Sequence, residues 1–148
     1  MVVLDSLIMH CAPNIDIKLM ESIIYVESKG NQYAINVNKG DHLTRQPYNY
    51  IEAIGWVNYL EKNNYNFDVG IAQINIKNIH KYGLRGIDAL NPCVNLELAN
   101  IILVNDYILV RKTFKYNLVL NTLSIYNSGN YITGYKNGYI KKILASNK

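Results

Sequence analysis

Apolar residues recur at every third or fourth position along most of this chain, which is the spacing of one face of an α-helix. The recurrence predicts helices over residues 4–10, 16–29, 49–63, 76–81, 95–114, 118–127 and 139–146. Residues 31–48 lack this spacing, and a short alternation before a turn-forming cluster favours a hairpin or an extended loop there. We therefore expect a predominantly helical α+β fold, with a cleft where the extended region meets the helices.

The helix expected over residues 49–63 has one apolar stripe with aromatic residues beside it. The stripe consists of Ile51, Ile54, Val57 and Leu60. Positions at this spacing share a helix face, so we expect the stripe to point into the core. Trp56 and Tyr59 flank the stripe. We interpret Trp56 as a core residue, and stacking of its ring on a sugar is the alternative.

The first long helix has a carboxylate on its apolar face. Glu27 lies at helical spacing from Ile23 and Ile24. Gly30 follows where a left-handed cap would end the helix. Burial raises the pKa of a carboxyl group, and a carboxylic acid that stays protonated near neutrality can donate the proton needed to cleave a glycosidic bond. The alternative is an ordinary helix-end glutamate with its carboxylate in solvent.

Length and composition indicate one folded domain. The chain has 148 residues, of which 49% are hydrophobic and 18% are charged. This suits a single domain over residues 1–148 with a proper core, and it excludes a disordered chain. The formal charge of +4 would help binding near a polyanion such as a cell-wall polymer. No run of Lys and Arg supports nucleic-acid binding.

The cysteines and histidines fit no metal or haem motif, so we expect no metal site. Cys11 and Cys93 leave two alternatives open, a long-range disulfide or two buried thiols. No uninterrupted apolar run approaches the roughly 18 residues of a membrane-spanning helix, so we expect no membrane insertion. Residues 1–10 lack a basic region and contain Asp5 within their apolar part, which makes them a poor signal peptide and leaves the route of export open.

Three separated segments combine polar side chains with turn-forming residues. They are Glu27-Ser28, Gly70-x-x-Gln73-Ile74-Asn75 and Tyr126-Asn127-Ser128-Gly129. Each is expected at a helix end or in a turn, where functional groups are often presented. Their carboxyl, amide and hydroxyl groups suit hydrogen bonding to sugar hydroxyls and acetamido groups.

In this order the segments resemble the motifs of the lytic transglycosylases of the lysozyme-like superfamily. That family has Glu-Ser at a helix end, then Gly-Leu-x-Gln, then Ala-Tyr-Asn-x-Gly. Ile71 stands here for the usual Leu, and Ile125 stands for the usual Ala. A narrower resemblance is to the transglycosylases encoded with type IV secretion and conjugation machinery. It is carried by residues 11–13, 33–35, 67–70, 73–75 and 88–93, within a match from about residue 7 to residue 145.

The resemblance implies a lysozyme-like fold and a peptidoglycan substrate, cut between N-acetylmuramic acid and N-acetylglucosamine. Glycosidases generally use two carboxylates. Here only Glu27 lies in a family motif, so it would serve first as acid and then as base. The muramyl 6-hydroxyl would attack the anomeric carbon and give a 1,6-anhydro product without a metal or cofactor. Asp68 as a second carboxylate, which would allow hydrolysis, is the alternative that we consider less favoured.

The resemblance also implies roles for the other motif residues. Gln73 and Asn75 would hydrogen-bond the sugar, and Tyr126 would orient Glu27 or the reacting sugar. Asn127 would hold the cleft wall, with a purely structural role as the alternative. Ser28 would contribute to substrate binding, and the alternative is that it caps its own helix end or supports the neighbouring loop.

The narrower subfamily pairs its two cysteines, which implies a Cys11–Cys93 disulfide and an oxidising compartment. The resemblance therefore implies a periplasmic or cell-surface monomer that opens the wall for a secretion or conjugation apparatus. Two alternatives stay open. One is a hydrolytic muramidase, and the other is a non-catalytic module that binds glycan or helps to assemble the apparatus.

Overall fold

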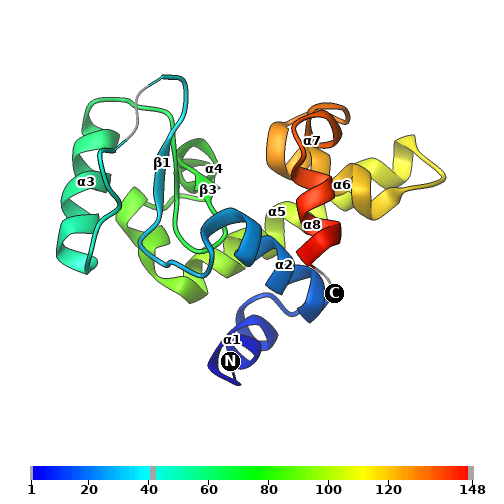
Figure 1. Cartoon of the computed structure of the whole chain (residues 1–148), viewed down its shortest axis with the longest axis horizontal. Coiled ribbons are helices and arrows are strands. Elements are labelled where there is room, and N and C mark those ends of the chain that lie inside the picture. The colour runs from blue at the N-terminus through cyan, green and yellow to red at the C-terminus, as the bar shows by residue number, and fades with distance from the viewer. Residues whose placement is uncertain (1, 41–42, 147–148) are drawn as a thin grey trace. The chain divides into compact units, whose positions relative to one another are not determined.

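The computed structural model describes residues 2–40 and 43–146 (Figure 1). Its helices are α1 (Val2–Cys11), α2 (Ile17–Ser28), α3 (Tyr50–Lys62), α4 (Ile76–Lys81), the 3-10 helix η1 (Gly86–Leu90), α5 (Pro92–Thr113), α6 (Leu118–Ser128), α7 (Thr133–Lys136) and α8 (Tyr139–Ser146). Its strands are β1 (Ile35–Val37), β2 (Phe67–Val69) and β3 (Ile74–Asn75). The predicted predominantly helical α+β fold class is confirmed, and each helix expected from the sequence is present.

The chain forms two compact units. One contains Met1–Val26 with Ala99–Lys148, and the other contains Glu27–Leu98. We refer to them as the terminal unit and the central unit. Helices α2 and α5 each begin in one unit and end in the other. This division does not test the number of domains, so a single domain over residues 1–148 stays a prediction.

Helices alone build the described part of the terminal unit. Its buried side chains include Ile8, Met20, Ile23, Leu123 and Ile143. Gly134 of α7 lies so close to α6 that an added Cβ would meet the Cα of Ser124 at 2.6 Å. The Ser124 hydroxyl accepts a hydrogen bond from the Gly134 N–H at 3.0 Å, so the small residue and the hydroxyl together fix this contact.

The central unit contains the antiparallel sheet, in the order β1-β2-β3. Ile35 pairs with Val69, and Val69 pairs with Ile74. All three are buried, because alternate side chains of a strand point to one face of the sheet. The extended region was thus expected correctly. A local hairpin was the wrong alternative, because β1 pairs with a strand that follows α3.

Helix α3 begins and ends within one residue of the predicted bounds, with Asn49 and Asn63 as its caps. The Asn49 side chain caps it by accepting a hydrogen bond from the Glu52 N–H at 2.9 Å. The predicted inward stripe is partly wrong, because Ile51 is 81% exposed and Ala53 is buried in its place beside Val57 and Leu60. The helix packs this face against η1, where an added Cβ on Gly86 would meet the Val57 side chain at 2.6 Å.

Because the buried face of α3 differs from the predicted stripe, Trp56 also lies in a different environment from the one expected. Its side chain is 40% exposed, so the expectation that it belongs to the core is wrong. Tyr59, one turn further along the helix, is 52% exposed. The two aromatic residues therefore face solvent in the central unit.

Among the described helices, α5 is long and apolar enough, by length and composition, to cross a membrane. Glu97 and Asp106 interrupt its apolar residues, so α5 is not an uninterrupted apolar run, and the absence of membrane insertion stays a prediction. One such helix is weak evidence for a membrane span, because the core helix of a globular protein meets the same criterion. Helix α5 also places Asn95, Leu96 and Ala99 in the protein interior.

Candidate active site

Glu27 lies in the last turn of α2 and is half-buried. Asp16 immediately precedes the helix, and its carboxylate accepts a hydrogen bond from the Leu19 N–H at 3.0 Å. It ends at Ser28, followed by Lys29 with φ 54° and Gly30 with φ 80°. The helix end and the left-handed glycine expected from the sequence are confirmed. The proton-donor role of Glu27 stays a prediction.

Ser28 ties this helix end to the loop that follows β2. Its hydroxyl donates to the Ile71 carbonyl at 2.7 Å and accepts from the Gly30 N–H at 3.2 Å. Ser28 thus both caps its own helix end and supports the loop, the two structural roles considered for it. The residue next to Glu27 is therefore hydrogen-bonded to the loop that contains the second motif.

The loop over residues 70–73 is held from the other side by Asn95 of α5. The Asn95 amide nitrogen donates to the Val69 and Ala89 carbonyls, both at 2.8 Å, and its oxygen accepts from the Ala72 N–H at 2.8 Å. Asn95 is 1% exposed, and all three partners are backbone groups. An added Cβ on Gly70 would lie 2.3 Å from the Asn95 amide nitrogen, so this position requires glycine.

Sequence reasoning missed Asn95 as a functional position. The residue lies near the start of a long apolar helix, and a buried amide there must be hydrogen-bonded. This requirement was the one signal in the sequence that could have identified Asn95 as a residue that holds other segments in place. The sequence could not give the partners, since they come from three other segments of the chain.

Gln73 anchors the same loop to β1. Its backbone has φ 54°, and its amide nitrogen donates to the Ala34 carbonyl at 3.0 Å and the Gly70 carbonyl at 2.9 Å. Its amide oxygen accepts from the Asn36 side chain at 2.8 Å. Both amide hydrogens are thus used within the protein, which leaves one lone pair of the oxygen for another partner.

Asn75 is equally committed to internal hydrogen bonds. Its oxygen caps α4 by accepting from the Lys77 N–H at 3.0 Å, and its nitrogen donates to Asn66 at 2.6 Å and to Asp68 at 2.9 Å. Asn36, Asp68 and Asn75 are cross-strand neighbours in the sheet register. The sheet therefore carries a polar row on the face opposite its buried side chains.

Asp68 is the one carboxylate in this row. Burial raises the pKa of its carboxyl, and hydrogen bonds from Asn75 and Asn38 offset part of that rise. A nucleophile or base in glycoside cleavage has to be ionised. A raised pKa works against that ionised form, and the hydrogen bond that Asp68 accepts from the Asn75 side chain favours an internal structural role.

Tyr126 and Asn127 lie in the last turn of α6, which ends at Gly129 with φ 80°. Tyr126 is half-buried and Asn127 is exposed. The Asn127 amide oxygen accepts from the Asn137 side chain at 2.8 Å, which gives it a structural contact within the terminal unit. Glu27 belongs to the central unit, so a shared site for Glu27 and Tyr126 stays a prediction.

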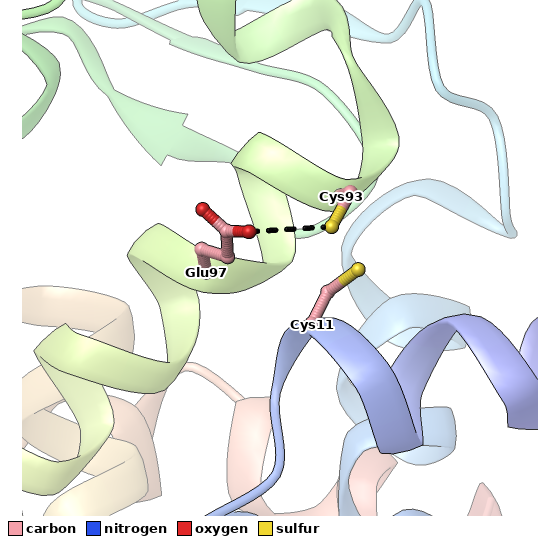
Figure 2. Close-up of side chains that lie close together, drawn as sticks. All are labelled: Cys11, Cys93 and Glu97. Atoms are coloured by element: carbon pink, nitrogen blue, oxygen red, sulfur yellow. Dashed lines mark hydrogen bonds between the residues drawn. The ribbon is translucent and has the colours of Figure 1, made fainter.

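Both cysteines are disulfide-bonded, and the chain has no others, so the predicted Cys11–Cys93 pair is confirmed. Figure 2 shows the two side chains with Glu97, whose Oε1 lies 3.4 Å from the Cys93 sulfur. These three residues cluster closely enough to surround a metal ion, but thiolates are the form that binds metal, and disulfide sulfurs are not thiolates. We assign no metal site to them.

Comparison with known proteins shows the family of this chain. The family model described as "Transglycosylase SLT domain" matches residues 7–145. The chain belongs to the transglycosylase SLT domain family. The resemblance of its three motifs to lytic transglycosylases is confirmed at the level of the family. The family comparison names no catalytic residues, so the individual site assignments stay predictions.

Curated relatives of this SLT-domain chain carry type IV secretion names. It is 37% identical over 145 residues to the type IV secretion system protein virB1 of Brucella abortus biovar 1, a match that covers 93% of this chain and 60% of the relative. It is 31% identical over 141 residues to protein virB1 of Rhizobium radiobacter, covering 94% of this chain and 58% of the relative. The chain thus spans about three fifths of the length of these relatives. No solved structure matches it.

Proposed function

We propose that this SLT-domain protein is a peptidoglycan lytic transglycosylase that cleaves the β-1,4 bond between N-acetylmuramic acid and N-acetylglucosamine. The observation that carries the proposal is the position of Glu27 at the end of α2. The hydroxyl of the next residue, Ser28, fixes that helix end to the loop of the second family motif at 2.7 Å. Membership in the SLT family supports the reaction class.

In this mechanism Glu27 moves a proton twice. It first protonates the glycosidic oxygen as the bond from that oxygen to the anomeric carbon breaks. It then accepts the proton of the muramyl 6-hydroxyl, whose oxygen bonds to the same anomeric carbon. One bond breaks, one bond forms and no water is consumed, so the product carries a 1,6-anhydro ring. Glu27 returns to its protonated form.

The second motif contributes mainly by positioning. Because the amide hydrogens of Gln73 and Asn75 are bound within the protein, these residues hold the loop and the sheet edge in place. Their remaining acceptor capacity is available to sugar hydroxyls. In the same proposal Tyr126 orients Glu27 or the reacting sugar, and Asn127 supports the wall of the cleft.

We further propose that the protein acts in the periplasm or at the cell surface, as a monomer beside a secretion or conjugation apparatus. The type IV secretion names of its relatives support this setting. The disulfide supports it independently, because such bonds persist in oxidising compartments. The proposal involves neither nucleic acid, nor a cofactor, nor membrane insertion.

The Glu27→Gln variant tests the proposal. It keeps the size of the side chain and removes the proton, so we expect the release of soluble fragments from purified sacculi to fall to background. Glu21→Gln, on the same helix, is the matched control and should retain cleavage. A Glu27→Gln protein that cleaves as fast as the wild type would exclude Glu27 as the acid. A wild-type protein that binds sacculi and releases nothing would favour the non-catalytic glycan-binding module.

A further inference from the structure

Helix α3 presents aromatic side chains to solvent on a face that the proposed chemistry does not use. Trp56, the one tryptophan of the chain, is 40% exposed and Tyr59 is 52% exposed. Tyr48, which precedes the helix, is 75% exposed. Exposed apolar groups gathered in one place usually mark a site of binding. We call these residues, with Glu52 and Gly55, the α3 platform.

The rings of the platform are held by one another. Trp56 and Tyr59 meet edge to face, with ring centres 6.0 Å apart and planes at 88°. Tyr59 also lies 6.3 Å from the ring of Tyr65. Aromatic contacts of this kind stabilise and orient the rings. Trp56 and Tyr59 therefore pack against each other at the exposed face of α3.

A shallow hollow lies between these rings. Glu52, Gly55, Trp56 and Tyr59 line a volume of about 400 Å³. A Cβ added to Gly55 would have no neighbour within 4 Å, so glycine keeps the floor of the hollow open and is not required by packing. The absence of a side chain here costs helix stability, which a binding function would explain.

Charged groups border the hollow, and they neutralise each other. The Glu52 carboxylate accepts two hydrogen bonds from the Arg45 guanidinium, at 2.8 Å and 3.1 Å, and one from the Tyr48 N–H at 3.0 Å. The bond from Arg45 is the main cause that lowers the pKa of Glu52. Arg45 in turn lies 3.8 Å above the centre of the Tyr48 ring. The border therefore offers fixed donors and acceptors without a net charge.

We propose that the α3 platform is a second glycan-binding site, which holds a sugar of the wall polymer away from the bond being cleaved. A pyranose has an apolar C–H face that suits an aromatic ring and a rim of uncharged hydroxyls that suits the Arg45–Glu52 pair. A neutral sugar also matches the balanced charge of the border. The inference rests on the proposed function, because that function supplies a glycan polymer as the substrate.

The test measures binding in a protein that cannot cut. In a Glu27→Gln background, Trp56→Ala and Gly55→Gln are compared for co-sedimentation with purified sacculi. Trp56→Ala removes the stacking ring, and Gly55→Gln fills the hollow while raising helix propensity, so folding is kept in the second variant. Tyr116→Ala removes a large aromatic side chain that is 80% exposed in the terminal unit, and serves as the control.

We expect each platform variant to raise the dissociation constant for sacculi by at least about fivefold and the control to change it by less than about twofold. Unchanged affinity in both platform variants would overturn the inference. The same result, combined with lost binding of a secretion-apparatus protein, would identify the platform as a protein-docking surface. If the wild type releases no fragments but binding still depends on Trp56, the proposed function fails and this inference stands.

Discussion

Removal of the Asn95 side chain is expected to loosen the framework around Glu27 without touching Glu27 itself. Asn95 is buried and binds three backbone groups, which belong to Val69, Ala72 and Ala89. These groups lie at the end of β2, in the loop of the second motif and in η1. One amide therefore joins three segments of the central unit.

The magnitude follows from the three hydrogen bonds that Asn95→Ala would remove. Two buried carbonyls and one buried N–H lose their hydrogen bonds, and each such group costs about 1–3 kcal/mol. Water that enters the space would satisfy part of this deficit. We expect the free energy of unfolding to fall by about 3–5 kcal/mol, which is a large part of the roughly 5–15 kcal/mol that stabilises a typical domain.

Urea denaturation followed by circular dichroism measures this loss. Asn95→Asp gives a second test with the same side-chain size, because a carboxylate has no hydrogen to donate to the Val69 and Ala89 carbonyls. Asn58→Ala, at an exposed position of α3, is the matched control and should change stability by less than about 0.5 kcal/mol. A loss below about 1 kcal/mol in Asn95→Ala would refute the assignment of Asn95 as the residue that holds this loop.

Three further outcomes are expected. Gly70→Ala should lower the free energy of unfolding by about 2–4 kcal/mol, because φ is 85° and the new Cβ would lie 2.3 Å from the Asn95 amide nitrogen; an unchanged melting temperature would contradict this. Burial raises the pKa of Asp68 in the folded protein. The contribution of this carboxyl group to the free energy of unfolding is therefore complete below the ordinary Asp pKa, and it is lost as the pH rises through the pKa of the folded state. Asp68→Asn should therefore gain stability relative to the wild type as the pH rises above about 4, the ordinary Asp pKa, and a pH-independent difference in urea midpoints would contradict this. Cys11→Ser should cost up to about 4 kcal/mol by freeing the chain between Cys11 and Cys93, and equal melting temperatures of variant and wild type would count against a stabilising disulfide.

Local signals explain what the sequence predicted well. Asn49 caps α3 through its own side chain, and Gly30 adopts the left-handed conformation that ends α2. Both effects depend on residues within one turn of the helix end, so they can be seen in the sequence. The position of Glu27 in the last turn of α2 follows from the same signals.

Features that depend on distant segments could not be predicted in this way. The partner of β1 follows α3 in the chain, and nothing near β1 specifies it. The buried face of α3 was ambiguous because Ile51 lies three residues before Ile54 and Ala53 lies four residues before Val57, so both positions fit an apolar helix face. Packing against η1 decided in favour of Ala53. Hydrophobicity alone would have favoured Ile51.

The amide side chains show a second limit of sequence reasoning. Gln73 and Asn75 were expected to bind sugar because their residue types suit it. In the folded chain their amide hydrogens are used to hold a loop and a sheet edge. A residue type gives the hydrogen-bonding capacity of a side chain, but the tertiary structure decides which partner receives it.

The chemical form of the product tests the central claim most directly. Purified sacculi would be digested with the wild type, and the soluble fragments would be analysed by mass spectrometry. The account predicts fragments that end in 1,6-anhydromuramic acid, one water lighter than hydrolysis products, and none from Glu27→Gln. Fragments with reducing muramic acid ends would show a hydrolytic muramidase, and anhydro fragments from Glu27→Gln would show that another group supplies the proton.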